Sequence, residues 1–166
     1  MMKKSILSVI ILLLLAGAVF CLFRPESEAD KVKKVLRTLC RMATKTPGEN
    51  AAAAALMISK TDKIFADNFH ISISNGMFNG SFNPTKMTSE LARYRAVFKN
   101  VKVEAQDMEV SFPAPNQAQL VFSGILNGDT KTGHTISEAR DVTCLLEKAP
   151  KGWLIKKMEI REIMEK

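Results

Sequence analysis

The sequence predicts an α+β domain in which three helices precede a mostly antiparallel sheet, with one transmembrane helix in front of the domain. Three observations predict it. A block without charge covers residues 5–23, apolar residues then recur at helical spacing in three segments before Asn100, and they alternate with polar residues after it. The chain has 166 residues, of which 46% are apolar. This length suits one domain with an appended segment, and the apolar content excludes global disorder.

Residues 5–23 are long enough to cross a bilayer as a helix. At a rise of about 1.5 Å per residue, the block spans roughly the 30 Å hydrocarbon core, and Lys4 and Arg24 flank it. A cleaved signal peptide is the alternative, with residues 16–18 (Ala-Gly-Ala) as the cleavage site. The apolar run continues beyond them to Phe23, whereas the apolar core of a signal peptide has only about 7–15 residues. The sequence therefore favours an uncleaved signal-anchor over a freely secreted protein.

The segment boundaries follow from this block. Residues 1–4 form a short N-terminal tail, 5–23 the anchor in membrane lipid, 24–30 a linker and 31–166 the folded domain. More basic residues follow the anchor than precede it, which would keep the domain in the cytoplasm, but long domains cross the membrane largely regardless of charge. We expect a single-pass protein of the bacterial inner (cytoplasmic) membrane, with its C-terminal domain outside the cytoplasm.

Two helices are predicted directly after the linker. Ser27 followed by Asp30 is typical of a helix N-terminal cap, and apolar residues at helical spacing extend the first helix to about Lys45. Thr46 and the proline after it indicate the start of a second helix, because threonine can cap and proline suits the first helical position. Five consecutive alanines favour this helix, which we expect to run toward Phe65.

A short strand pair and a third helix come next. Apolar and polar residues alternate over residues 69–73, and residues 75–76 (Asn-Gly) supply a turn into a strand that ends at Phe82. Asn83 and the proline after it open the third helix. Its apolar stripe comprises Met87, Leu91, Tyr94 and Phe98.

Four long strands are predicted after Asn100. In the first of them, Val103 and Val110 stand in opposite phases, which indicates a β-bulge near Gln106 and Asp107. Apolar residues at alternate positions mark the other three strands. They are Ala118, Leu120, Phe122 and Gly124, then Val142, Cys144 and Leu146, then Trp153, Ile155, Met158 and Ile160.

This order of elements resembles a known superfamily. Two helices, a short strand pair, a third helix and a meander that ends in the hairpin of residues 142–148 and 151–155 are similar to the nuclear transport factor 2-like, or SnoaL-like, superfamily. The resemblance covers about residues 28–164 and extends to membrane-anchored members. It implies a cystatin-like cone, in which the helices pack on a curved sheet around a pocket. Isomerases, dehydratases and cyclases of the superfamily hold a carboxylate base and an acidic hydrogen-bond donor there.

The candidates for such a catalytic pair are Asp107 or Asp141 as the base, with Tyr94 or His70 as the donor. Each has a plainer interpretation. Asp107 sits at the expected bulge, where a polar side chain can satisfy a freed backbone amide, and Asp141 is out of phase with Val142. Tyr94 lies on an apolar stripe and reads more readily as a core residue.

Four residues are candidates for lining the pocket of the implied cone: Tyr94, Arg140, Phe122 and Trp153. Arg140 shares the phase of the apolar residues in its strand, so it reaches the pocket rim or forms a salt bridge at the strand end. Val121 and Ile125 face the other side of their strand. They are candidate contacts for a homodimer through the open face of the sheet, an arrangement that is frequent in the superfamily.

Several kinds of site are not expected. The two histidines form no metal set, no phosphate-binding glycine loop is present, and we expect no metal and no cofactor. Cys40 and Cys144 read as free buried thiols, although export would permit a disulfide between them. Basic and acidic residues are interspersed, which argues against a nucleic-acid partner.

The sequence therefore favours a membrane-anchored, non-catalytic binding or assembly module for a protein partner or a small apolar ligand. The alternative is a small lyase or isomerase of the SnoaL-like type, with a pocket carboxylate as general base.

Overall fold

The computed structural model describes residues 26–74 and 78–162. The helices are α2 (Glu28–Ala43), α3 (Ala51–Ile58), the 3-10 helix η1 (Ser59–Lys63) and α4 (Pro84–Val97). The strands are β1 (Phe65–Ile73), β2 (Phe78–Phe82), β3 (Phe98–Ala114), β4 (Gln117–Thr130), β5 (Thr135–Ala149) and β6 (Gly152–Glu162). The predicted order of helices and strands is confirmed.

The predicted tail, the anchor of residues 5–23, the turn at residues 75–76 and the start of the linker lie outside the described residues. Across 26–74 and 78–162, none of the helices is long and apolar enough to cross a membrane.

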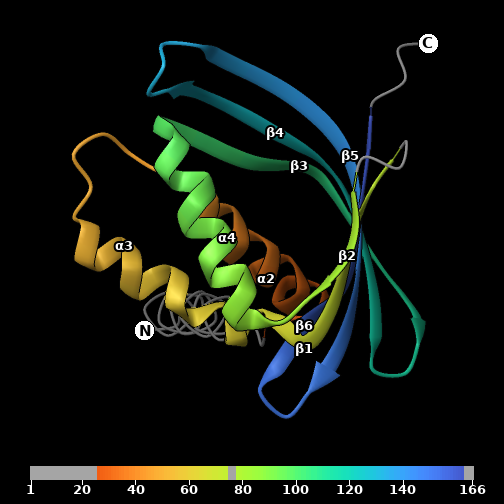
Figure 1. The fold of residues 1–166 in the computed structure, drawn as a ribbon. Helices are drawn as coiled ribbons and strands as arrows, with labels where there is room; N and C mark the ends of the chain where they lie inside the picture. The colour runs from red at the N-terminus through yellow and green to blue at the C-terminus, as the bar shows by residue number, and fades with distance from the viewer. Residues whose placement is uncertain (1–25, 75–77, 163–166) are drawn as a thin grey trace, which may run out of the picture.

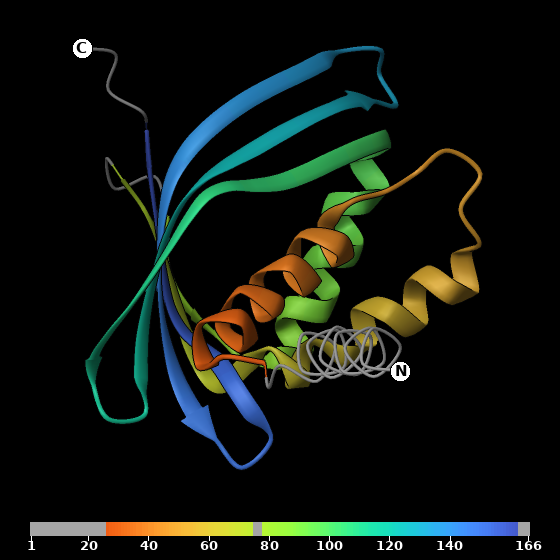
Figure 2. The ribbon, with the colours of Figure 1, turned by 180° about the vertical axis from the view of Figure 1, so that it is seen from behind.

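The six strands form one sheet in the order β2-β1-β6-β5-β4-β3. All neighbours are antiparallel except β1 and β6, which are parallel. The long strands bend, and α2, α3 and α4 lie together on the concave side of the sheet (Figure 1). Among the described residues, no helix lies on the convex side of the sheet, which is seen in profile in the view from behind (Figure 2). The expected architecture, helices packed on a curved and mostly antiparallel sheet, is confirmed.

The start of α2 is the one that the sequence predicts. The side-chain oxygen of Ser27 accepts a hydrogen bond from the backbone N–H of Asp30 at 3.1 Å, and the Asp30 carboxylate accepts from Ser27 in return. This capping box satisfies amides that would otherwise have no partner in the first turn. The helix ends at Ala43, close to the expected Lys45.

The second helix differs from its prediction at both ends. The residue that caps it is Asn50 and not Thr46. The side-chain oxygen of Asn50 accepts hydrogen bonds from the backbone amides of Ala52 and Ala53. The chain before it is held extended instead, since the backbone of Lys45 exchanges hydrogen bonds with Val101 in β3. The helix stops at Ile58, so Phe65 is the first residue of β1 and not part of a helix.

The third helix is capped by Asn83, which accepts a hydrogen bond from the amide of Lys86 at 2.8 Å. The helix ends at Val97, one residue earlier than the predicted stripe, so Phe98 opens β3. The buried positions of α4 are Met87, Leu91 and Arg95. The predicted bulge in β3 is confirmed, because the pairing with β4 shifts between Gln106 and Glu109 and Asp107 has a positive φ of 52°.

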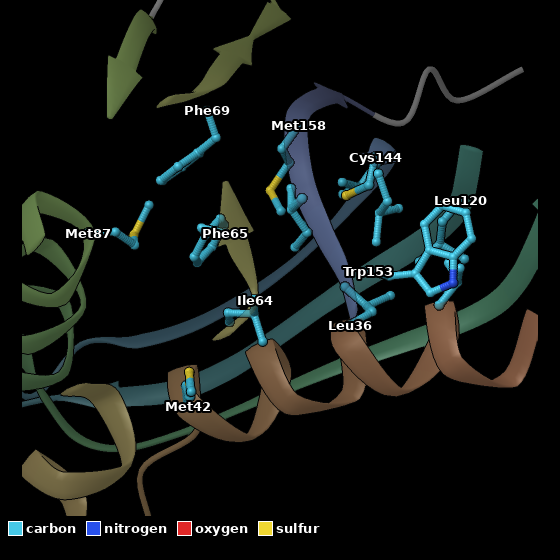
Figure 3. Close-up of a cluster of buried hydrophobic side chains, with 14 of the residues drawn as sticks. Leu36, Met42, Ile64, Phe65, Phe69, Met87, Leu120, Cys144, Trp153 and Met158 are labelled. Atoms are coloured by element: carbon cyan, nitrogen blue, oxygen red, sulfur yellow. The ribbon is translucent and has the colours of Figure 1, made fainter. Parts of the chain in front are cut away.

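The core fills the space between α2, α4 and the concave side of the sheet (Figure 3). Phe65 and Phe69 of β1 stack with ring centroids 4.2 Å apart, and Leu36 of α2 is 1% exposed. One buried charge lies beside this core. Arg95 donates to the carbonyl of Met42 at 2.6 Å and pairs with Glu49, so it ties α4 to the segment after α2.

Candidate ligand-binding pocket

An apolar pocket remains inside the cone, between α2, α4 and the concave side of the sheet. Its volume is about 280 Å³. Its lining residues come from both helices and from all the strands except β2. They are Leu36, Leu39, Cys40, Ala43, Phe65, Ile71, Met87, Leu91, Tyr94, Val103, Glu104, Phe122, Gly124, Leu126, Val142 and Met158.

Helical and strand periodicity explain this lining. Leu36, Leu39 and Cys40 lie three and four residues apart on one face of α2, and Phe122, Gly124 and Leu126 alternate along β4. Gly124 leaves space in the pocket, because a Cβ at this position would occupy it and lie only 3.4 Å from a methyl group of Val142. The pocket is therefore a consequence of the same alternation that builds the core.

The Tyr94 hydroxyl is the unusual polar atom of the site. It is buried and has no hydrogen-bond partner among the residues that the structure describes. Burial raises the pKa of Tyr94 to about 12, so the group stays protonated at neutral pH. Its ring packs against Phe98 with centroids 5.1 Å apart. A buried hydroxyl without a partner destabilises the protein, and the protein encloses this one, so a ligand acceptor would reach it only after a small movement of the surrounding side chains.

The two cysteines near the pocket are unreactive. Cys40 and Cys144 are free thiols. Burial raises the pKa of Cys40 to about 11 and that of Cys144 to about 12. Because the thiolate is the nucleophile, neither residue is suited to nucleophilic catalysis at neutral pH.

Glu104 is the one carboxylate among the described residues that line the pocket. Its side chain is 42% exposed, and one carboxylate oxygen lies 2.9 Å from Lys102 Nζ. The sequence did not single it out, because it is out of phase with Val103 and carries no motif. This exposure places Glu104 at the rim of the pocket, on the edge strand β3.

Two of the four predicted pocket residues, Tyr94 and Phe122, line this pocket. Trp153 is buried elsewhere, under the start of α2, where its Nε1 donates to Glu28 at 2.8 Å. It lines a separate groove between α2 and α3. Arg140 is not among the lining residues, and its guanidinium lies 3.4 Å from Glu138, as in the salt-bridge interpretation.

The predicted catalytic candidates are not brought together. Asp107 and Asp141 line a separate hollow with Val121 and Thr143. It lies on the face of the sheet opposite Tyr94, because Val142, the neighbour of Asp141, is buried in the core. His70 is part of neither hollow and lies 3.4 Å from the Ser81 hydroxyl.

The open face of the sheet carries exposed apolar side chains. Val121 is 39% exposed and Leu145 is 40% exposed, whereas Ile125 is half-buried. The homodimer through this face stays a prediction. In the described part of the chain, no group of three or more His, Cys, Asp or Glu residues could hold a metal ion.

No protein-family model and no curated protein matches this chain. Solved structures do. A nuclear transport factor 2-like superfamily protein from Salmonella enterica serovar Typhimurium has a TM-score of 0.64 at 10% identity, over 83% of this chain and 92% of that chain. A nuclear transport factor 2-like protein with a cystatin-like fold from Novosphingobium aromaticivorans has 0.62 at 11% identity, over 92% and 90%.

A third structure is that of a hexachlorocyclohexane dehydrochlorinase of type 2, with a TM-score of 0.61 at 10% identity over 78% of this chain and 81% of that chain. At these identities the likeness concerns the fold. The chain has the cystatin-like, nuclear transport factor 2-like fold, and the resemblance seen in the sequence is confirmed at that level.

Proposed function

We propose that this protein binds a small apolar molecule with one hydrogen-bond acceptor, such as a carbonyl or ether oxygen, inside the cone, without catalysing a reaction on it. The observation that supports this most directly is the unpaired, buried Tyr94 hydroxyl in an otherwise apolar pocket. A small movement of the side chains that enclose the Tyr94 hydroxyl would let a ligand oxygen accept from it and satisfy this donor. The surrounding leucine, methionine and phenylalanine side chains would bury the rest of the molecule.

The size of the pocket sets the size of the ligand. Its volume of about 280 Å³ is slightly below the range of about 300–1,000 Å³ that ligand pockets span. A monocyclic or short-chain molecule fits this volume. A protein of the same fold is named for hexachlorocyclohexane, which is also a small apolar molecule.

The catalytic alternative needs a general base within hydrogen-bond reach of the bound molecule. Asp107 and Asp141 lie across the sheet from Tyr94. Glu104 is at the rim and paired with Lys102. In the described part of the chain, no other carboxylate lines the pocket, so binding is the function that we propose.

The test uses two molecules of the same shape, acetophenone and ethylbenzene, of which only the first carries a carbonyl oxygen. Both should shift the NMR signals of pocket methyl groups such as those of Leu91 and Val142. Replacing Tyr94→Phe should weaken acetophenone about three- to tenfold relative to ethylbenzene, which is the loss of one hydrogen bond. If neither molecule binds, or if the ratio of the two Kd values is unchanged, the proposal is wrong.

A matched pair of variants places the binding inside the cone. Ala43→Leu adds volume to the pocket from α2, whereas Ala53→Leu makes the same change in α3, outside it. The first should abolish binding of both molecules and the second should leave it unchanged. Equal loss in both variants would contradict a site in the cone.

We also propose that residues 5–23 hold the domain at the inner membrane, with the domain outside the cytoplasm. The support is the length of the charge-free block and its basic flanks. The intact mass of the chain from membranes should include these residues, and a protease added from outside the cytoplasm should reach the domain. A mature N-terminus after residue 18 would instead show a cleaved signal peptide.

A further inference from the structure

A second hollow lies on another face of α2, away from the pocket. It has a volume of about 540 Å³ and lies between α2, α3 with η1, and the turn from β5 to β6. Its floor is apolar and consists of Val35, Met42, Leu56, Met57, Ile64 and Trp153. Its rim is basic and consists of Lys31, Lys34, Arg41, Lys60, Lys63 and Lys151. We call the hollow that these residues form the basic groove.

The rim has more positive charge than its surroundings neutralise. Lys31 Nζ lies 2.7 Å from Glu28, and Lys34 Nζ lies 3.3 Å from Glu26. The structure of residues 26–74 and 78–162 shows no ion pair for the other four cations. Glu26 is the one carboxylate among the described groove residues. The basic groove therefore suits an anionic partner.

The apolar part of the groove continues onto the outer surface of α3. This helix, Ala51–Ile58, carries no charged residue. Most of its alanines are exposed, and Leu56 is 62% exposed. An uncharged helix surface flanked by lysines is typical of segments that lie at a membrane interface, where the apolar side chains meet lipid and the ammonium groups reach the headgroups.

The groove begins where the charge-free block of the sequence ends. Glu26, at its edge, stands three residues after Phe23 in the chain. Three residues span at most about 10 Å. A bilayer that holds residues 5–23 would therefore lie within about 10 Å of Glu26, a distance close to the Debye length of about 8 Å at physiological salt.

We propose that the basic groove docks on anionic phospholipids of the membrane that holds residues 5–23, with its lysines at the headgroup phosphates and Leu56 turned toward the acyl chains. Each lysine close to an anionic surface strengthens the attraction about fivefold. The inference rests on the membrane anchor proposed above and is independent of ligand binding in the cone.

The test uses the full chain reconstituted into vesicles of phosphatidylcholine, with or without phosphatidylglycerol. The rate at which an amine-reactive ester modifies each lysine is followed by mass spectrometry. Lys60, Lys63 and Lys151 should react at least about threefold more slowly in the anionic vesicles. Lys99 and Lys131 are exposed and lie outside the groove. Their modification rates therefore correct for the slower reaction of all amines in the acidic layer at an anionic surface.

Two pairs of substitutions separate the groove from a general effect of charge. Lys60→Glu with Lys63→Glu reverses two rim charges, and Lys99→Glu with Lys131→Glu makes the same change elsewhere. All four side chains are exposed, so both variants should fold, as circular dichroism would check. The protection of Lys151 by phosphatidylglycerol should disappear in the first variant and persist in the second.

Equal corrected rates in the two kinds of vesicle would overturn the proposal. Equal protection by inorganic phosphate in phosphatidylcholine vesicles would also overturn it, because the groove would then bind a soluble anion rather than a bilayer. Extraction of the chain from the vesicles by alkaline carbonate would overturn the anchor itself, so the two failures are distinguishable. Loss of acetophenone binding would affect neither result.

Discussion

The two faces of α2 make two very different regions. Toward the sheet, Leu36 and Leu39 enclose an apolar pocket, and toward α3, Lys34 and Arg41 stand over the basic groove. The buried hydrogen-bond donors of the two regions differ in whether they have an acceptor. The Trp153 N–H beside the groove has a carboxylate partner at 2.8 Å, whereas the Tyr94 hydroxyl in the pocket has no partner among the described residues. One amphipathic helix thus lies between the Trp153 N–H, which has a partner, and the Tyr94 hydroxyl, which has none among the described residues.

The largest difference between the two faces should be seen in Leu36→Ala and Val35→Ala, a pair of adjacent residues. Leu36 is 1% exposed in the core, so its truncation should lower the free energy of unfolding by about 3 kcal/mol. Val35 faces the groove and is only partly buried, so its truncation should cost less than about 1 kcal/mol. Denaturation in urea measures both, and equal losses would contradict the division of α2 into a core face and a groove face.

Trp153→Phe should be the next largest change. It removes the donor to Glu28 and part of a ring that is 5% exposed and packs against Phe112. We expect a loss of about 2 kcal/mol in the free energy of unfolding, from the lost hydrogen bond and the smaller side chain. An unchanged stability would mean that Trp153 fills a site at the groove without holding α2 to the sheet.

Tyr94→Phe should have a smaller effect of the opposite sign. Removing a buried hydroxyl that has no partner should leave the stability of the ligand-free protein unchanged or raise it by up to about 1 kcal/mol. Thr61→Val is the control, because the Thr61 hydroxyl is also buried but donates to the carbonyl of Pro84 at 2.9 Å, and its removal should destabilise. A clear loss of stability in Tyr94→Phe would show that the hydroxyl is not free for a ligand.

The smallest expected effect concerns the pH dependence of stability through Glu28. Hydrogen bonds from Lys31, then Lys148 and Trp153, lower the pKa of this carboxyl from 4.5 to about 2. Its contribution to stability is therefore complete above pH 4.5 and is lost as the pH falls toward 2. Glu28→Gln should make the fall in stability over this range less steep. The change is small because the group is exposed, and an identical acid profile would contradict the pairing.

Local signals predicted the parts of this fold that depend on a few neighbouring residues. The capping box at Ser27 and the bulge at Asp107 are both read from short patterns, and both are confirmed. The prediction that α3 starts at Thr46 is wrong, because the pairing of Lys45 with Val101, far along the chain, decides which residue caps the helix. No local pattern contains that contact.

The site shows the same limit. Alternation along a strand tells which face a side chain occupies, so it placed Phe122 inward and Asp141 outward. It does not tell which part of the concave side is filled by the core and which is left open. Trp153 was therefore predicted to line the pocket, although it lies at the other end of the sheet, beside the start of α2. The unpaired state of the Tyr94 hydroxyl depends on the packing of α4 and could be found only from the structure.

The parallel pairing of β1 with β6 has a consequence for the order of events in folding. Of the strands that the structure describes, β1 is the first and β6 the last, so Phe65 meets Ile155 only after nearly the whole domain has been synthesised. Contacts between such distant segments form late and slow the folding of a domain. A nascent chain that lacks β6 leaves an edge of β1 without its partner, and an unpaired edge favours aggregation. The last eleven residues of the sheet, Gly152–Glu162, thus decide when the cone closes as well as how.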